Sequence, residues 1–225
     1  MIKNNDYVNV VYNEEERPFT NYPSKLINHI IKKFSLSPNS RILEVGCGRG
    51  EFIQSFIDFG FNGYGFDISN YAKDKFPEKK FKQGDFLKGE YYDNEYFDII
   101  FTKSFVEHFH DPEEIFEKFY SLLKKDGILI TMTPEWKYNI IDFYEDYTHR
   151  TPFSKESLRD IHLITNFTEI NIKSFKQLPI LWNDNYFFRL LSFLAQILIP
   201  NILKKNFKFI KFSKEIMLLS YAKKK

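Results

Sequence analysis

The sequence predicts an α/β domain in which a mostly parallel sheet carries helices on both faces. Short apolar runs with β-branched residues alternate along the chain with segments whose apolar residues recur at helical spacing. Glycines directly follow the first of these runs, and acidic residues follow the next ones. At 225 residues, the chain is long enough for one such domain with an elaboration and too short for two.

The first forty residues are predicted to form a cap and a helix. Residues 1–20 are polar and aromatic without clear periodicity. Ser24 then precedes apolar residues at helical spacing, which predicts a helix with Ser24 as its N-cap. The helix is expected to end before Ser37 and Pro38, because it cannot continue through a proline.

A glycine turn lies in the stretch RILEVGCGRGEF at 41–52. Its first five residues predict a buried strand, and Gly46, Gly48 and Gly50 follow at once. A helix is predicted to begin near the third glycine and to stop at Gly60. Glycines let the backbone approach a ligand where a Cβ would collide, so this turn predicts a nucleotide-type ligand.

The charges beside this turn favour a cationic ligand over a diphosphate. A dinucleotide site has the spacing G-x-G-x-x-G and places pyrophosphate on the helix N-terminus. Here the third glycine comes one residue early and Glu51 follows it, while Glu44 precedes the turn. These carboxylates would repel a diphosphate and suit a ligand with an ammonium and a sulfonium, such as S-adenosylmethionine.

At these residues the sequence resembles the class I S-adenosylmethionine-dependent methyltransferases, whose first motif is an acidic residue followed by G-x-G-x-G. The resemblance implies a three-layer, Rossmann-like sheet of about seven strands, mostly parallel, whose last strand is antiparallel. It also implies S-adenosylmethionine as cofactor. Two other classes stay open: an oxidoreductase, which Glu51 disfavours, and a non-catalytic protein that keeps the cofactor fold and docks a partner or membrane through its basic C-terminal region.

Two later strands lead to acidic residues near the predicted ligand. A strand over 62–67 ends in Asp67, about twenty residues past the glycines, where a carboxylate can accept both ribose hydroxyls of a nucleoside. Capping of the following helix is the alternative role of Asp67. A third strand, over 79–83, leads to Asp85. The resemblance also assigns the ribose to Asp67, and it implies that Asp85 binds the adenine amino group while Phe86 packs on the ring.

A fourth strand is predicted over 97–102, where the residues are almost continuously apolar, as in a central buried strand. By resemblance, the residues after it form the family's fourth motif, beside the methionine part of the cofactor. The complete cofactor-binding prediction comprises Glu44, Gly46, Cys47, Gly48, Gly50, Asp67, Ile68, Asp85, Phe86, Lys103 and Ser104.

The second half of the chain continues the alternation of strands and helices. Asp111 and Pro112 are predicted to open a helix that ends around 124–127. A later helix is predicted with Ser154 or Ser157 as its cap. Further strands are predicted over 128–133, 167–175 and 215–222.

The segment 135–151 is rich in Trp, Tyr, His and acidic residues and poor in periodicity. Loops beyond the carboxyl ends of parallel strands build the site of an open sheet, so this segment is predicted to contact the methyl acceptor. The run DYTHRTPFSKESL at 146–158 resembles a segment of quinone-type and glycan-pathway methyltransferases. The predicted acceptor is an oxygen of a small molecule, of a sugar or phosphosugar in a surface-glycan pathway, or of a lipid-linked molecule.

Methyl transfer from a sulfonium needs aligned reactants, and a base only where the acceptor must lose a proton. His149 is the predicted base because imidazole titrates near neutrality, and Asp146 is predicted to orient it. His108 is the second candidate. A structural hydrogen bond within its loop is the alternative role of each histidine. Five dispersed histidines and one cysteine show no metal-ligand spacing, so no metal site is predicted.

The use of cysteine is consistent with a reducing compartment. The single cysteine, Cys47, cannot form an internal disulfide, and its place in the glycine turn favours a small buried filler over a nucleophile. The N-terminus lacks the apolar core of a signal peptide. We therefore expect a cytoplasmic protein.

An insertion at 178–213, much longer than a hairpin needs, separates the last two predicted strands. It contains the densest apolar run, YFFRLLSFLAQILIP at 186–200, which is shorter than the roughly 20 residues that cross a bilayer. Lysines and aromatic residues alternate after it. From 176 to 225, ten Lys and Arg oppose two Asp and Glu, an excess of +8, which leaves 2 − 8 = −6 for the rest.

Three roles of this insertion stay open. A helix pair on the anionic inner face of a membrane would gain about 1 kcal/mol from each nearby cation. A lid or homodimer interface would pack the aromatic residues and leave the lysines in solvent. Nucleic acid is disfavoured because the stretch contains no known binding motif.

Overall fold

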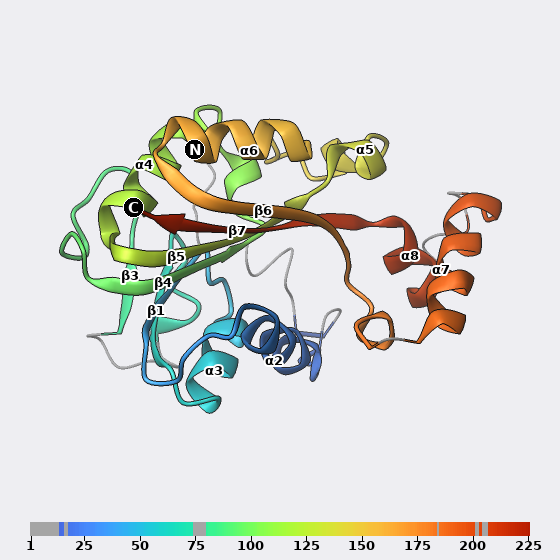
Figure 1. The fold of residues 1–225 in the computed structure, drawn as a ribbon, viewed down its shortest axis with the longest axis horizontal. Helices are drawn as coiled ribbons and strands as arrows, with labels where there is room; N and C mark the ends of the chain where they lie inside the picture. The colour runs from blue at the N-terminus through green and yellow to red at the C-terminus, as the bar shows by residue number, and fades with distance from the viewer. Residues whose placement is uncertain (1–13, 16–17, 74–79, 184, 201–202, 204–206) are drawn as a thin grey trace.

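The computed structural model describes residues 14–15, 18–73, 80–183, 185–200, 203 and 207–225. Its strands are β1 (Arg41–Val45), β2 (Asn62–Asp67), β3 (Phe81–Gln83), β4 (Phe97–Lys103), β5 (Leu123–Pro134), β6 (Phe167–Lys176) and β7 (Ile216–Lys224). They form one sheet in the order β3-β2-β1-β4-β5-β7-β6 (Figure 1). The first five strands pair in parallel, and β7 lies antiparallel between β5 and β6. The predicted sheet, with its antiparallel last strand, is confirmed.

Helices cover both faces of this sheet, as predicted for a three-layer fold. α2 (Tyr22–Phe34) and α3 (Glu51–Asp58) lie on one face. α4 (Pro112–Leu122) and α6 (Lys155–Ile164) lie on the other (Figure 1). A capping box in which Ser154 and Ser157 exchange hydrogen bonds begins α6, as the sequence predicts.

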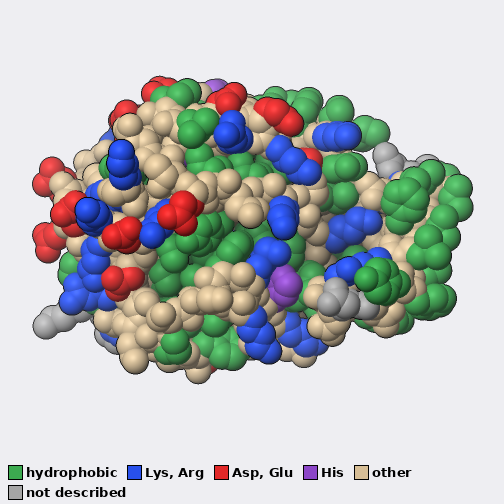
Figure 2. Space-filling view, viewed as in Figure 1, with side chains coloured by type: hydrophobic (Ala, Val, Ile, Leu, Met, Phe, Trp, Pro, Cys, Tyr) green, Lys and Arg blue, Asp and Glu red, His purple; other side chains and the backbone are tan. Residues whose placement is uncertain are grey.

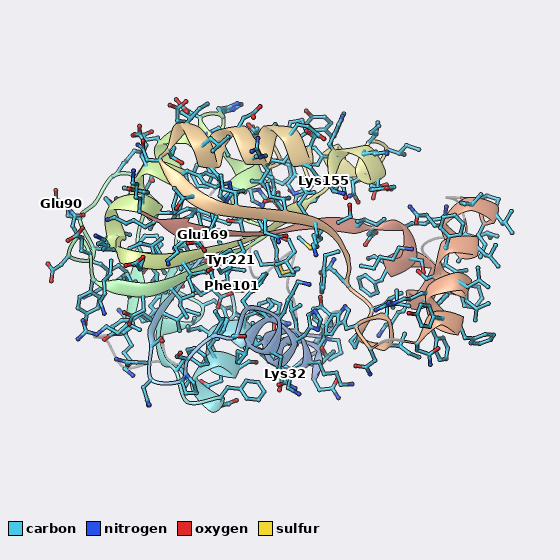
Figure 3. The ribbon with its side chains drawn as sticks, in the orientation of Figure 1. Lys32, Glu90, Phe101, Lys155, Glu169 and Tyr221 are labelled. Carbon is cyan, nitrogen blue, oxygen red and sulfur yellow. The ribbon has the colours of Figure 1, made fainter. Side chains whose placement is uncertain are left out.

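Two apolar clusters, one on each face, hold the layers together. On the α2–α3 face, Phe101 of β4 is fully buried and meets Phe56 edge to face, with ring centroids 5.5 Å apart. On the other face, Phe116 and Phe119 of α4 pack against the sheet. Figure 3 shows Phe101 inside the molecule and Lys32 on the outer side of α2. Burial on both faces explains why the central strands are almost continuously apolar.

The first helix begins earlier than predicted. Ser24 is not its N-cap, because α2 starts at Tyr22 with Asn21 as N-cap. Pro23 lies in the first turn, where a residue without a backbone N–H fits a helix start. Ser35 ends the helix in the left-handed conformation, before Ser37 as predicted. The predicted N-terminal cap falls mostly outside the described residues, as does position 79 of the predicted third strand.

The helix α4 ends earlier than the predicted 124–127, and β5 begins at once. Leu123 is fully buried and pairs with Phe97 of β4, so the chain joins the sheet directly after Leu122. The register then shifts before Ile99 pairs with Ile128, which makes the intervening residues an irregular strand start. Asp111 occupies the N-cap of α4, but its side chain makes no capping hydrogen bond with the described residues.

The described residues of the insertion between β6 and β7 include the elements η4 (Pro179–Leu181), α7 (Tyr186–Leu198) and α8 (Lys208–Lys214). α7 and α8 pack against each other and project beyond the end of the sheet (Figure 1). Lys204 and Lys205 of the predicted basic stretch lie outside the described residues. Within the part of the chain that the structure describes, every helix is too short or too polar to span a bilayer.

Candidate active site

The glycine turn after β1 has three residues in the left-handed region. Gly46, Gly48 and Gly50 have φ values of 76°, 49° and 77°. A Cβ on Gly46 would lie 2.6 Å from Cδ2 of Phe105, so the neighbouring chain requires this glycine. A Cβ on Gly48 would meet none of the described residues within 4 Å, and Gly48 lines a cavity. Gly48 therefore leaves space for a ligand.

Carboxylates occupy the N-terminus of α3. Oε2 of Glu44 accepts a hydrogen bond from the backbone N–H of Ile53 at 2.7 Å, and burial raises the pKa of Glu44 well above its usual range. Glu51, in the first helical turn, pairs with Arg49 at 2.6 Å. Dinucleotide folds place pyrophosphate at this helix end. Because Glu44 already accepts from the N–H of Ile53 and the Glu51 carboxylate lies in the first turn, this helix end disfavours a diphosphate.

A cavity of about 520 Å³ lies along the carboxyl ends of β1 to β4. Asp67 ends β2 at its wall. Its carboxylate accepts hydrogen bonds from the backbone N–H groups of Gly48 and Ser69, each at 2.8 Å. The bond from Ser69 is of the kind that a capping residue makes. Asp85 and Phe86 follow β3 and line the same cavity, where Phe86 is almost fully buried.

Lys103 brings a cation to this cavity. It is the last residue of β4, and its Nζ lies 5.5 Å from the ring centroid of Phe52. Burial lowers the pKa of Lys103, while the nearby carboxylates of Glu107 and Glu44 act in the opposite direction. The cavity thus combines the ammonium of Lys103 and the guanidinium groups of Arg49 and Arg150 with several carboxylates, a distribution that suits a zwitterionic ligand.

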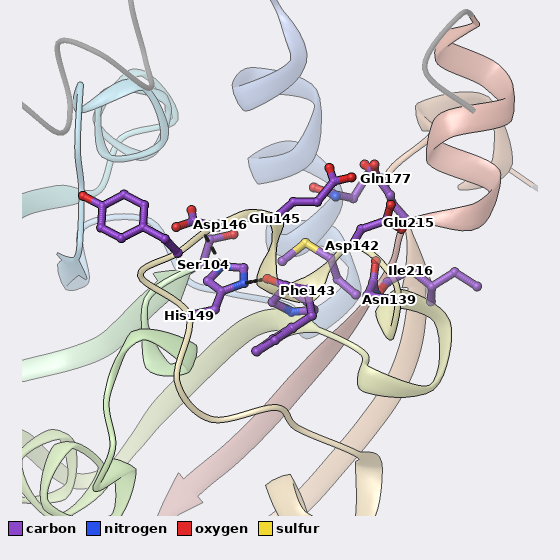
Figure 4. Close-up of a pocket in the computed structure, with 13 residues that line it drawn as sticks. Ser104, Asn139, Asp142, Phe143, Glu145, Asp146, His149, Gln177, Glu215 and Ile216 are labelled. Atoms are coloured by element: carbon purple, nitrogen blue, oxygen red, sulfur yellow. Dashed lines mark hydrogen bonds and ion pairs between the residues drawn. The ribbon is translucent and has the colours of Figure 1, made fainter. Parts of the chain in front are cut away.

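A second cavity, of about 410 Å³, adjoins the first, and Ser104 and Tyr147 line both. Figure 4 shows Asp146 and His149 on one side of it and Gln177 and Glu215 on another. Its carboxylates are Asp142, Glu145, Asp146 and Glu215. The described residues that line it include neither lysine nor arginine.

His149 is oriented by a backbone carbonyl. Its Nδ1 lies 2.6 Å from the backbone oxygen of Phe143 (Figure 4). Because a carbonyl oxygen only accepts, Nδ1 carries the proton and the neutral ring keeps a lone pair on Nε2. Nε2 lies 3.9 Å from Oδ2 of Asp146, too far for a hydrogen bond but close enough for that carboxylate to stabilise a protonated ring.

His108 stands between the two cavities. The hydroxyl of Thr148 donates to Oδ1 of Asp146 at 2.5 Å and therefore accepts from Nδ1 of His108, which lies 2.9 Å away. The ring centroids of His108 and His149 are 4.9 Å apart. His108 lines the first cavity, whereas His149 and Asp146 line the second. The three predicted catalytic residues thus lie together where the cavities meet.

A family model described as a methyltransferase domain matches residues 15–171. The chain belongs to this methyltransferase family. It is therefore an enzyme, and its cofactor is S-adenosylmethionine, as the first motif predicted. This assignment favours neither of the two alternatives, an oxidoreductase or a non-catalytic protein.

Solved structures share the fold of this methyltransferase. A SAM-dependent methyltransferase from Archaeoglobus fulgidus is similar at 22% identity and a TM-score of 0.64, over 95% of this chain and 99% of that chain. A Haemonchus contortus phosphoethanolamine N-methyltransferase in complex with S-adenosyl-L-methionine has 16% identity and a TM-score of 0.67, over 100% and 60%. A possible histamine N-methyltransferase from Thermotoga maritima has 19% identity and a TM-score of 0.64, over 97% and 99%. No curated protein sequence matches the chain.

The first cavity fits the cofactor of the methyltransferase. Ten of the eleven predicted cofactor residues line it; the exception is Gly50, which is the N-cap of α3. Asp67 would hold the ribose hydroxyls, and Lys103 would hold the methionine carboxylate. Cys47 lines the cavity, and burial raises the pKa of its thiol well above the usual range, which favours a small filler over a nucleophile, as predicted. The prediction missed several lining residues: Phe52 of α3 and, from loops, Arg49, Phe105, Phe109, Tyr147, Thr148 and Arg150.

Glu107 is a buried residue that the prediction also missed. Its Oε2 accepts from the hydroxyl of Thr133 at 3.0 Å, its Oε1 has no partner among the described residues, and burial raises its pKa to about 7. Ligand atoms of Glu107, His108 and His149 lie within 4.8 Å of one another, so this group could hold a metal ion. Spacing could not reveal the group because about forty residues separate the two histidines.

Proposed function

We propose that the enzyme methylates a hydroxyl oxygen of a neutral, polyhydroxylated acceptor of the sugar class, bound in the second cavity. The composition of that cavity carries the proposal. Carboxylates and the amides of Asn139 and Gln177 form hydrogen bonds with hydroxyl groups, and Phe143 and Tyr147 offer aromatic surface. The segment 146–158 resembles quinone-type and glycan-pathway enzymes, and the glycan half of that resemblance supports the same class.

The charged residues that line the second cavity favour a neutral acceptor over a phosphorylated one. A phosphorylated sugar would need cations near its phosphate, but the described lining residues offer carboxylates without lysine or arginine. We therefore favour a neutral sugar over a phosphosugar. A lipid-linked sugar fits equally well, provided that its lipid lies outside the cavity.

Each residue at the junction has a distinct part in the proposed reaction. When bound, S-adenosylmethionine supplies a methyl group on a sulfonium. Ser104 and Tyr147 line both cavities and would position the acceptor hydroxyl beside the cofactor. Nε2 of His149 would take the hydroxyl proton, and the carboxylate of Asp146 would stabilise the resulting imidazolium.

An amine is the second candidate for the acceptor. The four carboxylates that line the cavity also suit an ammonium group. Two of the similar structures are named N-methyltransferases, one for phosphoethanolamine and one for histamine. An ammonium must lose a proton before its nitrogen can accept a methyl group, so Nε2 of His149 would serve here too.

A panel assay with a trideuteromethyl donor separates these classes. The enzyme is incubated with neutral monosaccharides and their methyl glycosides, sugar phosphates, ethanolamine and histamine, and products are analysed by mass spectrometry. We expect a trideuteromethyl group on oxygen of a neutral sugar. Label on nitrogen alone would establish the second candidate, and label on sugar phosphates alone would contradict the charge argument.

His149→Gln tests the base. Loss of the proton acceptor should lower kcat by about 10²-fold to 10⁴-fold, while calorimetric binding of S-adenosylhomocysteine stays unchanged. His110→Gln is the matched control, because His110 is exposed and lines neither cavity. Full turnover by His149→Gln would show that this histidine is not the base.

A further inference from the structure

Helix α7 presents its large apolar side chains to solvent. Tyr186, Phe187 and Leu198 are 79%, 64% and 70% exposed. Five more exposed apolar residues lie on the same helix: Leu190, Leu191, Phe193, Leu194 and Ile197. The residues that α7 buries are small, Ser192 and Ala195. A surface helix of a globular protein normally buries its large apolar side chains, so this orientation is reversed.

Polar contacts hold α7 in this orientation. The hydroxyl of Ser192 donates to the hydroxyl of Ser213 in α8 at 2.8 Å, and Nζ of Lys176 donates to Ser192 at 2.9 Å. Nζ of Lys214 donates to the backbone oxygen of Gln196 at 2.9 Å. Specific hydrogen bonds therefore fix the small, polar side of α7 towards the protein and leave the apolar side outward.

The charged residues within α7 and α8 are all positive, and Glu215, directly after α8, lies 3.9 Å from Nζ of Lys211. Residues 185–214 contain six Lys and Arg and no Asp or Glu. The described cations are Arg189, Lys208, Lys211 and Lys214, which come from both helices. Figure 2 shows hydrophobic side chains along the outer rim of this region and Lys or Arg side chains on the side nearer the sheet. We call the exposed apolar residues of α7 together with Arg189, Lys208 and Lys211 the α7–α8 surface.

We propose that the α7–α8 surface docks the enzyme on an anionic lipid bilayer, with α7 lying in the membrane interface. Apolar side chains enter the acyl boundary while adjacent cations contact anionic head groups, and each such cation strengthens binding by roughly fivefold. A second copy of the chain fits this surface less well, because pairing the same face would bring its cations together. An anionic bilayer can bury the apolar side chains and also bind the cations of this surface.

The α7–α8 surface also adjoins the second cavity. Gln177, directly after β6, and Glu215, directly after α8, both line that cavity. Docking would thus bring the cavity to the membrane surface, where the head group of a lipid-linked acceptor lies. This consequence for the acceptor rests on the proposed function, whereas the docking itself does not.

Vesicle sedimentation tests the docking with the full chain. We expect wild-type protein to sediment with vesicles of phosphatidylglycerol and phosphatidylcholine at low salt, less at about 0.5 M salt, and little with phosphatidylcholine alone. The double variant Phe187→Asp with Leu190→Asp should bind at least about tenfold more weakly, because it places charges in the inserted face. Lys208→Glu with Lys211→Glu should also bind at least about tenfold more weakly, with a smaller salt dependence.

The matched control is Leu163→Asp with Ile164→Asp, which changes two exposed apolar residues of α6, and it should bind as wild type. Thermal unfolding confirms that each variant is folded, and turnover on a soluble acceptor reports the proposed function separately. Absence of wild-type binding to anionic vesicles would overturn the docking. So would unchanged binding by the Phe187→Asp, Leu190→Asp variant, or a dimer in ultracentrifugation that this variant alone dissociates.

Discussion

The two cavities that meet at Ser104 and Tyr147 are built in different ways. The cofactor cavity is formed mainly by residues at the ends of four neighbouring parallel strands, at 44–52, 66–68, 84–86 and 103–105. The acceptor cavity draws on the segment 139–149 between β5 and α6, on Gln177 directly after β6 and on 215–217 at the start of the antiparallel strand β7, so no single strand–loop pattern supplies them. The fold itself therefore fixes the cofactor site, whereas loops and the ends of the last two strands fix the acceptor site.

His162 lines neither cavity, so it should affect the free energy of unfolding and not cofactor binding. Burial lowers the pKa of His162 from 6.5 to about 4. As the pH falls from 6.5 to 4, the unfolded chain binds a proton that the folded chain excludes, so His162 should lower the free energy of unfolding by about 3 kcal/mol. Denaturant titrations of His162→Leu should lack this loss.

The matched control for His162 is His110→Leu, which changes an exposed histidine and should keep the wild-type pH dependence. S-adenosylhomocysteine affinity at neutral pH should stay unchanged in both variants. An acid-side loss of stability in His162→Leu equal to that of wild type would show that this histidine does not exclude a proton.

Among the cavity variants, removal of the Asp67 carboxylate should cause the largest loss of affinity for the cofactor product. Asp67→Ala should weaken S-adenosylhomocysteine binding by about 100-fold, because hydrogen bonds from two ribose hydroxyls to a carboxylate are lost. Asp98→Ala is the matched control, since Asp98 accepts from the backbone N–H of Arg41 at the opposite end of the sheet. Equal calorimetric affinity in Asp67→Ala and Asp98→Ala would place the ribose elsewhere.

Two glycines of the turn should have different roles: Gly46 packs against Phe105, and Gly48 faces the cofactor cavity. Gly46→Ala should lower the free energy of unfolding by about 2 kcal/mol, because its Cβ would meet Phe105 and its φ is positive. Gly48→Ala should cost about 1 kcal/mol, from its positive φ alone, yet weaken S-adenosylhomocysteine binding. Urea unfolding and calorimetry measure the two effects. A Gly48→Ala variant with wild-type affinity would contradict the close approach of the ligand.

The smallest effect is expected at Gln177. Gln177→Ala should raise the KM for the acceptor found in the panel assay by about tenfold, through loss of one hydrogen bond. The affinity for S-adenosylhomocysteine should not change, because Gln177 lines only the acceptor cavity. Steady-state kinetics and calorimetry together decide this. A parallel loss of cofactor affinity would show that the cavities are not separate in function.

The same comparison explains how far the sequence could predict the site. Asp67 and Asp85 could be located because parallel strands bring their carboxyl ends to one edge, so position after a strand predicts position in space. Gln177 and Glu215 could not be located in this way. They approach each other because β6 pairs with β7, with Lys176 opposite Ile216, and such long-range pairing leaves no local pattern.

The end of α4 and the orientation of α7 also depend on long-range contacts that leave no local pattern in the sequence. The predicted end of α4 is wrong because Leu123, followed by two lysines and an aspartate, has the pattern of a helix end, whereas its pairing with Phe97 places it in β5. The apolar run of α7 was visible in the sequence, but its outward orientation depends on Ser192 meeting Ser213 across twenty-one residues. Tertiary contacts of this kind override local preference.

Calorimetry of the wild-type enzyme tests most directly the claim that the larger cavity binds a sulfonium nucleoside. S-adenosylhomocysteine and NADH would be titrated separately into the same preparation. Saturable heat with S-adenosylhomocysteine and none with NADH is the predicted result. Saturable heat with NADH and none with S-adenosylhomocysteine would contradict the assignment of both cavities.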